Sequence, residues 1–128
     1  MTDRISGSAF KQMITFGAAC VTQQKQAIND LNVFPVPDGD TGTNMSLTIQ
    51  TAVNELKKSE PATVGEAAKI TAGALLRGAR GNSGVILSLL FRGLSKSVKG
   101  LTDMDGVQLA AAMAEGLSLI HISEPTRP

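Results

Sequence analysis

Residues 32–45 read Asn-Val-Phe-Pro-Val-Pro-Asp-Gly-Asp-Thr-Gly-Thr-Asn-Met, and this stretch organises the sequence on both sides of it. Each of its two prolines pushes the preceding residue toward extended backbone, so the stretch begins as a stiff loop. Asp38 and Asp40 follow, separated by one glycine that lets the backbone bend until both carboxylates can meet one ion or an ion pair. A helix is expected from near Thr43 to about Lys58, and its first N–H groups can face an anion.

One or two carboxylates, completed by water and substrate phosphates, are typical of a Mg²⁺ site. Asp38 and Asp40 are therefore candidate catalytic residues and metal ligands. The alternative for an Asp-Gly-Asp sequence is a turn that only caps the next helix. A calcium-binding EF-hand loop is excluded, because its sixth and twelfth positions counted from Asp38 hold Thr43 and Ile49 rather than glycine and glutamate. The candidate phosphate-binding residues at the helix start are Thr41, Gly42, Thr43 and Asn44.

A second glycine-rich stretch, residues 78–84, reads Gly-Ala-Arg-Gly-Asn-Ser-Gly and also precedes a predicted helix. It lacks the Gly-Lys-Ser/Thr of a P-loop, and no strand precedes it as in a dinucleotide-binding fingerprint. Alone, such a stretch is most often a turn between two helices. Two such loops in one short chain favour a nucleotide site, since a nucleotide needs several anchors, and they suggest a nucleotide-dependent phosphoryl transferase.

The rest of the sequence predicts an all-α fold with about five helices and no period-two alternation typical of strands. Helices are expected over 5–31, 43–58, from Thr63 to the second loop, over 85–98, and over 107–116. Predicted caps are Asp3 or Ser6 for the first helix, Thr63 with Glu66 for the third, and Asp103 or Asp105 for the last. The predicted inward stripe of the first helix is Phe10, Met13, Phe16, Cys20, Ala27, Ile28 and Leu31.

Composition excludes several classes of function. The chain has 128 residues, a net charge of +1, four Phe and no Tyr or Trp, so it lacks the basic surface and the stacking platforms of nucleic-acid-binding proteins. Its single cysteine, Cys20, cannot form an internal disulfide and is predicted to be a buried, inert thiol. No signal peptide or membrane-spanning apolar run is visible, and the expected location is the cytoplasm.

Residues 117–128 end in a short polar tail, and they resemble the in-frame translation of a transposon-based sequencing adapter. The expected organisation is therefore a partial domain over 1–116 and a non-native tail over 117–128, in a reading frame cut in mid-gene. His121, the only histidine, lies in this tail and is not treated as a catalytic candidate.

The two loops together resemble the N-terminal ATP-binding domain of the fatty acid kinase ATP-binding subunit, a member of the dihydroxyacetone kinase L-subunit superfamily. The resemblance runs from about Ile5 to Gly116. It implies a barrel of about eight antiparallel amphipathic helices, of which about five are present here. It also implies that Asp38 and Asp40 hold two Mg²⁺ ions against the phosphates of ATP, which Thr41 to Asn44 would contact.

A third metal ligand is known in the superfamily, and the candidates here are Asn32, tentatively, and Asp30. The resemblance assigns the second nucleotide-facing loop to Ala79, Arg80, Gly81, Asn82 and Ser83. The implied reaction transfers the γ-phosphoryl group of ATP to the carboxylate of a fatty acid, which a fatty-acid-binding partner protein presents. The alternatives are the nucleotide-binding subunit of a dihydroxyacetone kinase and a non-catalytic, metal-dependent interaction module. Residues 1–116 alone are expected to be inactive, marginally stable and prone to associate as a homo-oligomer.

Overall fold

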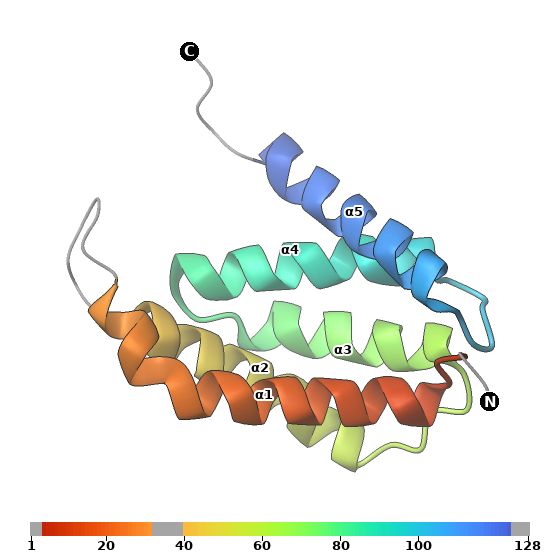
Figure 1. The fold of residues 1–128 in the computed structure, drawn as a ribbon, viewed down its shortest axis with the longest axis horizontal. Helices are drawn as coiled ribbons and strands as arrows, with labels where there is room; N and C mark the ends of the chain where they lie inside the picture. The colour runs from red at the N-terminus through yellow and green to blue at the C-terminus, as the bar shows by residue number, and fades with distance from the viewer. Residues whose placement is uncertain (1–3, 32–39, 124–128) are drawn as a thin grey trace.

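The computed structural model describes residues 4–31 and 40–123, with side chains described as far as residue 118. Its five helices are α1 (Gly7–Asp30), α2 (Thr41–Lys57), α3 (Val64–Gly78), α4 (Gly81–Ser97) and α5 (Gly106–Ser123). In these ranges the only extended pairing is one antiparallel bridge between Ile5 and Met104. Consecutive helices run in opposite directions (Figure 1), and the predicted all-α fold is confirmed.

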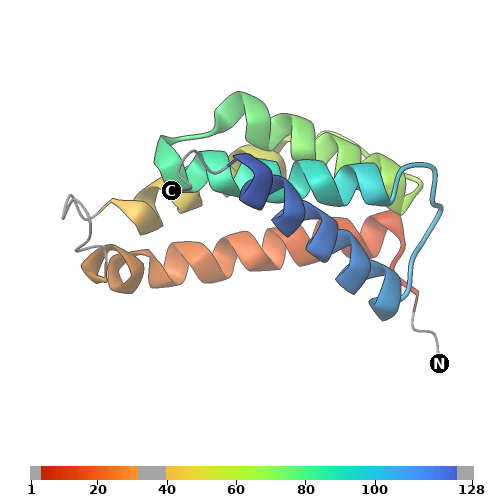
Figure 2. The ribbon, with the colours of Figure 1, turned by 90° about the horizontal axis from the view of Figure 1, so that it is seen from above.

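The helices α2 and α3 form the middle of the bundle, since each packs against the other and against both α1 and α4. Among the described helices, α5 packs against α4 alone, and Figure 2 shows it inclined across that helix. The largest fully buried apolar side chains come from α2, α3, the C-cap of α4 and the α4–α5 connection: Leu56, Val64, Leu75, Val98 and Met104. This core holds the two central helices at a fixed separation, which matters for the site at their ends.

Two glycines allow α4 and α5 to approach closely. A Cβ atom added at Gly93 would lie 2.8 Å from the carbonyl oxygen of Glu115, and one added at Gly116 would collide with the carbonyl oxygen of Leu90. Real Cβ atoms do not approach backbone this closely, so any side chain at either position forces the two helices apart.

Side-chain caps fix where α1 and α3 begin. Ser6 Oγ accepts a hydrogen bond from the Ala9 N–H at 3.1 Å, so the predicted Ser6 cap is confirmed, whereas Asp3 lies outside the described residues. Thr63 Oγ1 accepts from the Glu66 N–H at 3.0 Å, as predicted. Glu66 Oε1 reaches back one residue further than a standard capping box and accepts from the Ala62 N–H at 2.9 Å.

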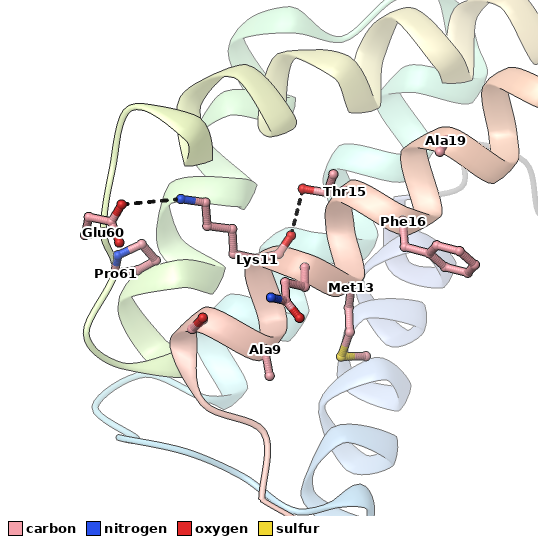
Figure 3. A pocket seen from close by; sticks show the side chains of 10 residues that line it. Ala9, Lys11, Met13, Thr15, Phe16, Ala19, Glu60 and Pro61 are labelled. Atoms are coloured by element: carbon pink, nitrogen blue, oxygen red, sulfur yellow. Dashed lines mark hydrogen bonds and ion pairs between the residues drawn. The ribbon is translucent and has the colours of Figure 1, made fainter.

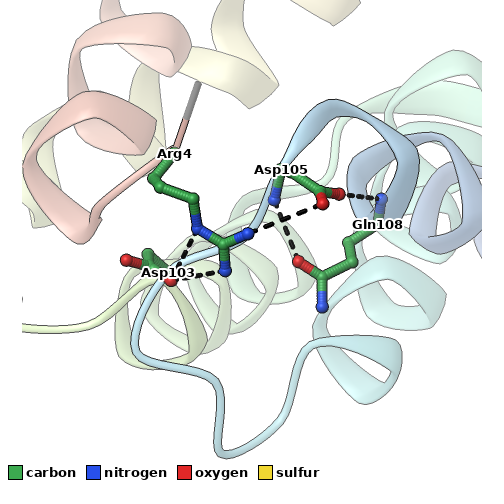
Figure 4. Close-up of polar contacts among 4 residues, drawn as sticks. All are labelled: Arg4, Asp103, Asp105 and Gln108. Carbon is green, nitrogen blue, oxygen red and sulfur yellow. Dashed lines mark hydrogen bonds and ion pairs between the residues drawn. The ribbon is translucent and has the colours of Figure 1, made fainter. Parts of the chain in front are cut away.

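The N-terminal segment is tied to the α4–α5 connection by a polar cluster (Figure 4). The Arg4 guanidinium donates to Asp103 Oδ1 at 2.7 and 3.1 Å, and it lies 3.5 Å from Asp105 Oδ2. The hydrogen bond to Asp103, with the negative charge of both carboxylates, raises the pKa of Arg4 above its ordinary value. Asp105 also caps α5: its Oδ1 accepts from the Gln108 N–H at 2.8 Å, while Gln108 Oε1 accepts from the Asp105 N–H at 2.9 Å. Of the two predicted caps, Asp105 is the one used.

Replacing Asp105 by alanine removes the cap of α5. We expect Asp105→Ala to lower the free energy of unfolding by about 1 kcal/mol, because two N–H groups lose their reciprocal arrangement. Asp105→Asn keeps the acceptor oxygen and loses only the charge near Arg4, so it should cost much less. Urea titration of both variants checks this, and equal losses would assign the effect to the ion pair instead.

The predicted inward face of α1 is wrong except for Phe10, which is buried as predicted. The buried side chains are Phe10, Ile14 and Ala18, which recur every four residues and point toward α2 and α3. A stripe through these three leaves the opposite side of the helix in solvent, and most of the predicted stripe lies there. Exposed on α1 or at its end are Met13, Phe16, Cys20, Ala27 and Leu31. The prediction that Cys20 is a buried thiol is therefore also wrong.

Three element boundaries differ from prediction. Helix α2 begins at Thr41, α4 begins at Gly81 inside the second glycine-rich stretch, and α5 continues to Ser123 rather than ending near Gly116. The loop between α3 and α4 thus shrinks to Ala79 and Arg80. In the described part of the chain, no helix has the length and apolar content needed to cross a membrane.

Candidate functional site

The first turns of α2 and α4 lie together at one end of the bundle, because both helices run away from that end (Figure 1). A side-chain contact joins them directly: Ser83 Oγ, in the first turn of α4, donates to the carbonyl oxygen of Thr41 at 3.3 Å. The structure therefore brings together the described parts of both glycine-rich motifs, which are separated by about 40 residues in sequence.

Thr48, about two turns into α2, links the start of α2 to the start of α4. Its hydroxyl donates to the carbonyl oxygen of Asn44 at 2.7 Å and accepts from the backbone N–H of Arg80 at 3.0 Å. The side chain is fully buried, so no water replaces either bond if the hydroxyl is removed. Thr48 thus fixes the position of the α3–α4 loop relative to the first turns of α2.

Two glycines at the start of α4 are required by close approach to α2. Gly81 has a φ of +67°, a left-handed conformation that other residues rarely adopt, and a Cβ there would collide with the side chain of Asn44. A Cβ on Gly84 would lie 2.5 Å from Thr48 Oγ1. The glycines of the second motif therefore let the N-terminus of α4 sit directly against α2.

Asn29, near the end of α1, holds the start of α2. Its Oδ1 accepts from the Thr43 N–H at 3.1 Å, and its Nδ2 donates to Thr43 Oγ1 at 3.0 Å. This double contact ties Thr43 into the scaffold rather than leaving its N–H for a ligand. Sequence reasoning missed Asn29; its only signal was an amide side chain shortly before the first motif.

The residues at the N-caps of these helices, Asp40 for α2 and Arg80 for α4, make no side-chain hydrogen bond to their own helices. Both side chains are exposed. The Asp40 carboxylate is therefore not the helix cap that the alternative interpretation required. A carboxylate, a guanidinium and two helix starts that their own N-cap side chains leave open are the groups that bind a metal–phosphate pair.

Of the candidate metal ligands, Asp40 and Asp30 lie in the part of the chain that the structure describes. Asp38 and Asn32 lie outside the described residues, and Asp30 Oδ1 accepts a hydrogen bond from Gln26 Nε2 at 3.0 Å. Within residues 4–31 and 40–123, no three acidic, histidine or cysteine side chains come together as a metal site. The assignment of Asp38, Asp40 and Asn32 to Mg²⁺ stays a prediction. The described donor set fits a hard cation at Asp40, since its oxygens are free of the helix.

A separate groove of about 900 Å³ follows the exposed side of α1 (Figure 3). Met13 and Phe16 contribute apolar surface, and Pro61 lines one end beside Glu60, whose carboxylate lies 3.9 Å from Lys11 Nζ. None of the predicted nucleotide-binding residues lines this groove. The groove exists because α1 exposes apolar side chains, and its lining is separate from the site at the starts of α2 and α4.

Comparison with known proteins gives consistent matches. Residues 35–125 match the DAK2 domain family, a range that includes the described parts of both motifs and ends inside 117–128. Protein YloV of Bacillus subtilis (strain 168) is 42% identical over 117 residues, which cover 91% of this chain and 21% of YloV. Uncharacterized proteins of Staphylococcus haemolyticus and Staphylococcus epidermidis are each 44% identical over 121 residues, covering 94% of this chain and 22% of theirs. The chain thus spans about a fifth of the length of these curated relatives.

Proposed function

Given that this chain belongs to the DAK2 domain family, we propose that it is the ATP- and Mg²⁺-binding part of a kinase that phosphorylates a fatty acid. The acceptor is the carboxylate of an acyl chain held by a separate lipid-binding protein, and the product is an acyl phosphate. Family membership supports the coarser part, a kinase-related nucleotide-binding subunit. The assignment of a fatty acid as the acceptor rests on the resemblance of the two loops to those of the fatty acid kinase ATP-binding subunit.

The observation that carries the proposal is the junction of two glycine-rich helix starts whose own N-cap side chains, Asp40 and Arg80, make no capping hydrogen bond. The Ser83 contact to Thr41 and the Arg80 contact to Thr48 hold these starts together. Each start directs backbone N–H groups and the positive end of its helix dipole outward. A triphosphate needs several such donors at once, and one helix start supplies too few.

Each residue then has a role that its position supports. Asp40, with Asp38 before it, would hold Mg²⁺, whose bound charge offsets that of the phosphates during transfer. The first turns of α2 and α4 would orient the phosphates through Thr41, Asn82 and their neighbours. Arg80, exposed at the start of α4, would face the transferred group from the second loop. No covalent enzyme intermediate is required, because positioning and charge stabilisation suffice for phosphoryl transfer.

Titration of the full-length protein with ATP in a calorimeter tests this assignment. Asp40→Asn and Asp38→Asn should each weaken ATP binding in Mg²⁺ by about tenfold or more, since losing even about 1.4 kcal/mol of charge interaction lowers affinity tenfold. In excess EDTA the same variants should bind ATP much as the parent does. The loss should therefore appear only when the metal is present.

Glu115→Gln is the matched control, because it makes the same charge change at an exposed position on α5. Unchanged Mg²⁺-dependent affinity in both aspartate variants would refute the metal-ligand assignment. Turnover separates the remaining candidates: phosphate transfer to a carrier-bound fatty acid supports the proposal. Transfer to dihydroxyacetone would indicate the triose kinase, and ATP binding without transfer would indicate a non-catalytic module.

A further inference from the structure

A second groove, of about 270 Å³, runs between the outer sides of α3 and α4. Its apolar lining includes Leu76 from α3 and Leu89 from α4. Three cationic residues line it as well, Lys69 from α3 and Arg92 and Lys96 from α4. None of the residues proposed to bind ATP belongs to this lining, so the groove is a distinct feature of the surface.

Gly73 lies in the middle of α3, where glycine disfavours the helix, and it also lines the groove. Unlike Gly81, Gly84 or Gly93, it is not pressed against another element. A Cβ at Gly73 would meet only the flexible end of Arg77, at 3.3 Å. Close helix packing therefore gives no reason for this glycine, and its missing side chain keeps the groove open.

The charges of the groove are one-sided. No acidic side chain lines it, and in the described part of the chain Lys69, Arg92 and Lys96 form no ion pair. The sequence of α4 contains no acidic residue at all. Because α3 and α4 run in opposite directions, Leu76 lies toward one end of the groove and Lys96 toward the other. The groove thus has an apolar end and a cationic end.

We propose that this groove binds a single-chain amphiphile with an anionic headgroup, a carboxylate or a phosphate. The alkyl chain lies over Gly73, Leu76 and Leu89, and the headgroup lies among the unpaired cations. The concave shape favours one inserted chain over a flat bilayer, which would contact protruding side chains instead. This site goes beyond the proposed function, in which the acyl chain is carried by the partner.

Laurate and dodecyl phosphate, each below its micelle concentration, are the probes for calorimetric titration of the full-length protein. We expect saturable binding of at least one of them. Arg92→Gln with Lys96→Gln should weaken it by about tenfold, since two charge-assisted contacts are lost. Gly73→Met, which fills the groove while favouring the helix, should abolish the same binding. The matched control is Lys57→Gln with Lys58→Gln, an equal charge change at the exposed end of α2.

Several outcomes would overturn this site. The first is that the parent protein shows no saturable binding of laurate or dodecyl phosphate, in which case the Arg92/Lys96 and Lys57/Lys58 double variants have nothing to compare. Equal affinities of these two double variants would also overturn it, and so would unaltered binding by Gly73→Met. Equal binding of dodecyltrimethylammonium would refute the headgroup assignment. Binding only to phosphatidylglycerol vesicles, with no monomer binding, would replace the groove with a membrane-contact surface. Mg²⁺-dependent ATP affinity, measured alongside, should remain unchanged in every groove variant, so failure here is distinct from failure of the kinase assignment.

Discussion

Thr48→Val should lower the free energy of unfolding by about 1–3 kcal/mol, although the two side chains have nearly the same shape. Valine cannot accept the hydrogen bond from the Arg80 N–H, and it leaves that donor facing an apolar, fully buried side chain in place of its partner. The start of α4 should then move relative to α2. Because the proposed phosphate contacts come from both helix starts, ATP binding in Mg²⁺ should weaken as well.

Thr48→Ser is the matched control for this prediction. It keeps the hydroxyl and both of its hydrogen bonds, and it loses only a methyl group. Chemical denaturation gives the stability of each variant, and calorimetry gives the ATP affinity. If Thr48→Val binds ATP as tightly as Thr48→Ser does, the relative position of the two helix starts does not control nucleotide binding.

Gly93→Val should lower the free energy of unfolding at least as much as Thr48→Val does. The new side chain would meet the Gly116 Cα and the Glu115 carbonyl oxygen, which are backbone atoms and cannot rotate away. Overpacking of this kind costs about 1–3 kcal/mol, and the cost here should reach the upper part of that range. Helix α5 should be displaced from α4, which is its only helical partner among the described elements.

Gly73→Val supplies the comparison, because it adds the same side chain at an open position on α3. Its stability should stay close to that of the parent, since valine suits a helix at least as well as glycine does. Thermal melting of the two variants, with near-ultraviolet spectra of the folded state, measures the difference. Equal melting temperatures would show that α4 and α5 do not pack closely at Gly93.

The number and order of the helices were predictable, because capping residues and glycine-rich breaks punctuate the sequence clearly. The buried faces of α1 and α4 were not. In α4 the buried residues include Gly84, Ser88 and Gly93, while Val85 and Ile86 are exposed. A hydrophobic pattern cannot detect a helix face that is buried because its side chains are small enough for a neighbouring helix to approach closely. On α1 the cause is different: apolar residues lie on both sides of the helix, and the predicted stripe followed Phe16 although the buried face runs through Ile14 and Ala18.

The candidate site shows a similar division. Glycine, carboxylate and hydroxyl residues at helix starts are visible in a sequence, so both motifs could be recognised as possible phosphate sites. The contacts that join them could not, since they depend on how closely α2, α3 and α4 approach. Thr48 looked like an ordinary helix residue, yet it carries a buried link between the two loops. Asn29 acts across a helix pair in the same way.

The pairing of the N-terminal segment with the α4–α5 connection has a consequence for how the chain assembles. Helices α1 to α4 meet mainly neighbours in sequence, a low contact order that favours rapid folding. Arg4 and Asp103, by contrast, are 99 positions apart, and the bridge from Ile5 to Met104 spans the same distance. During synthesis this closure must wait until the α4–α5 connection has left the ribosome, whereas the contacts among α1 to α4 can form earlier.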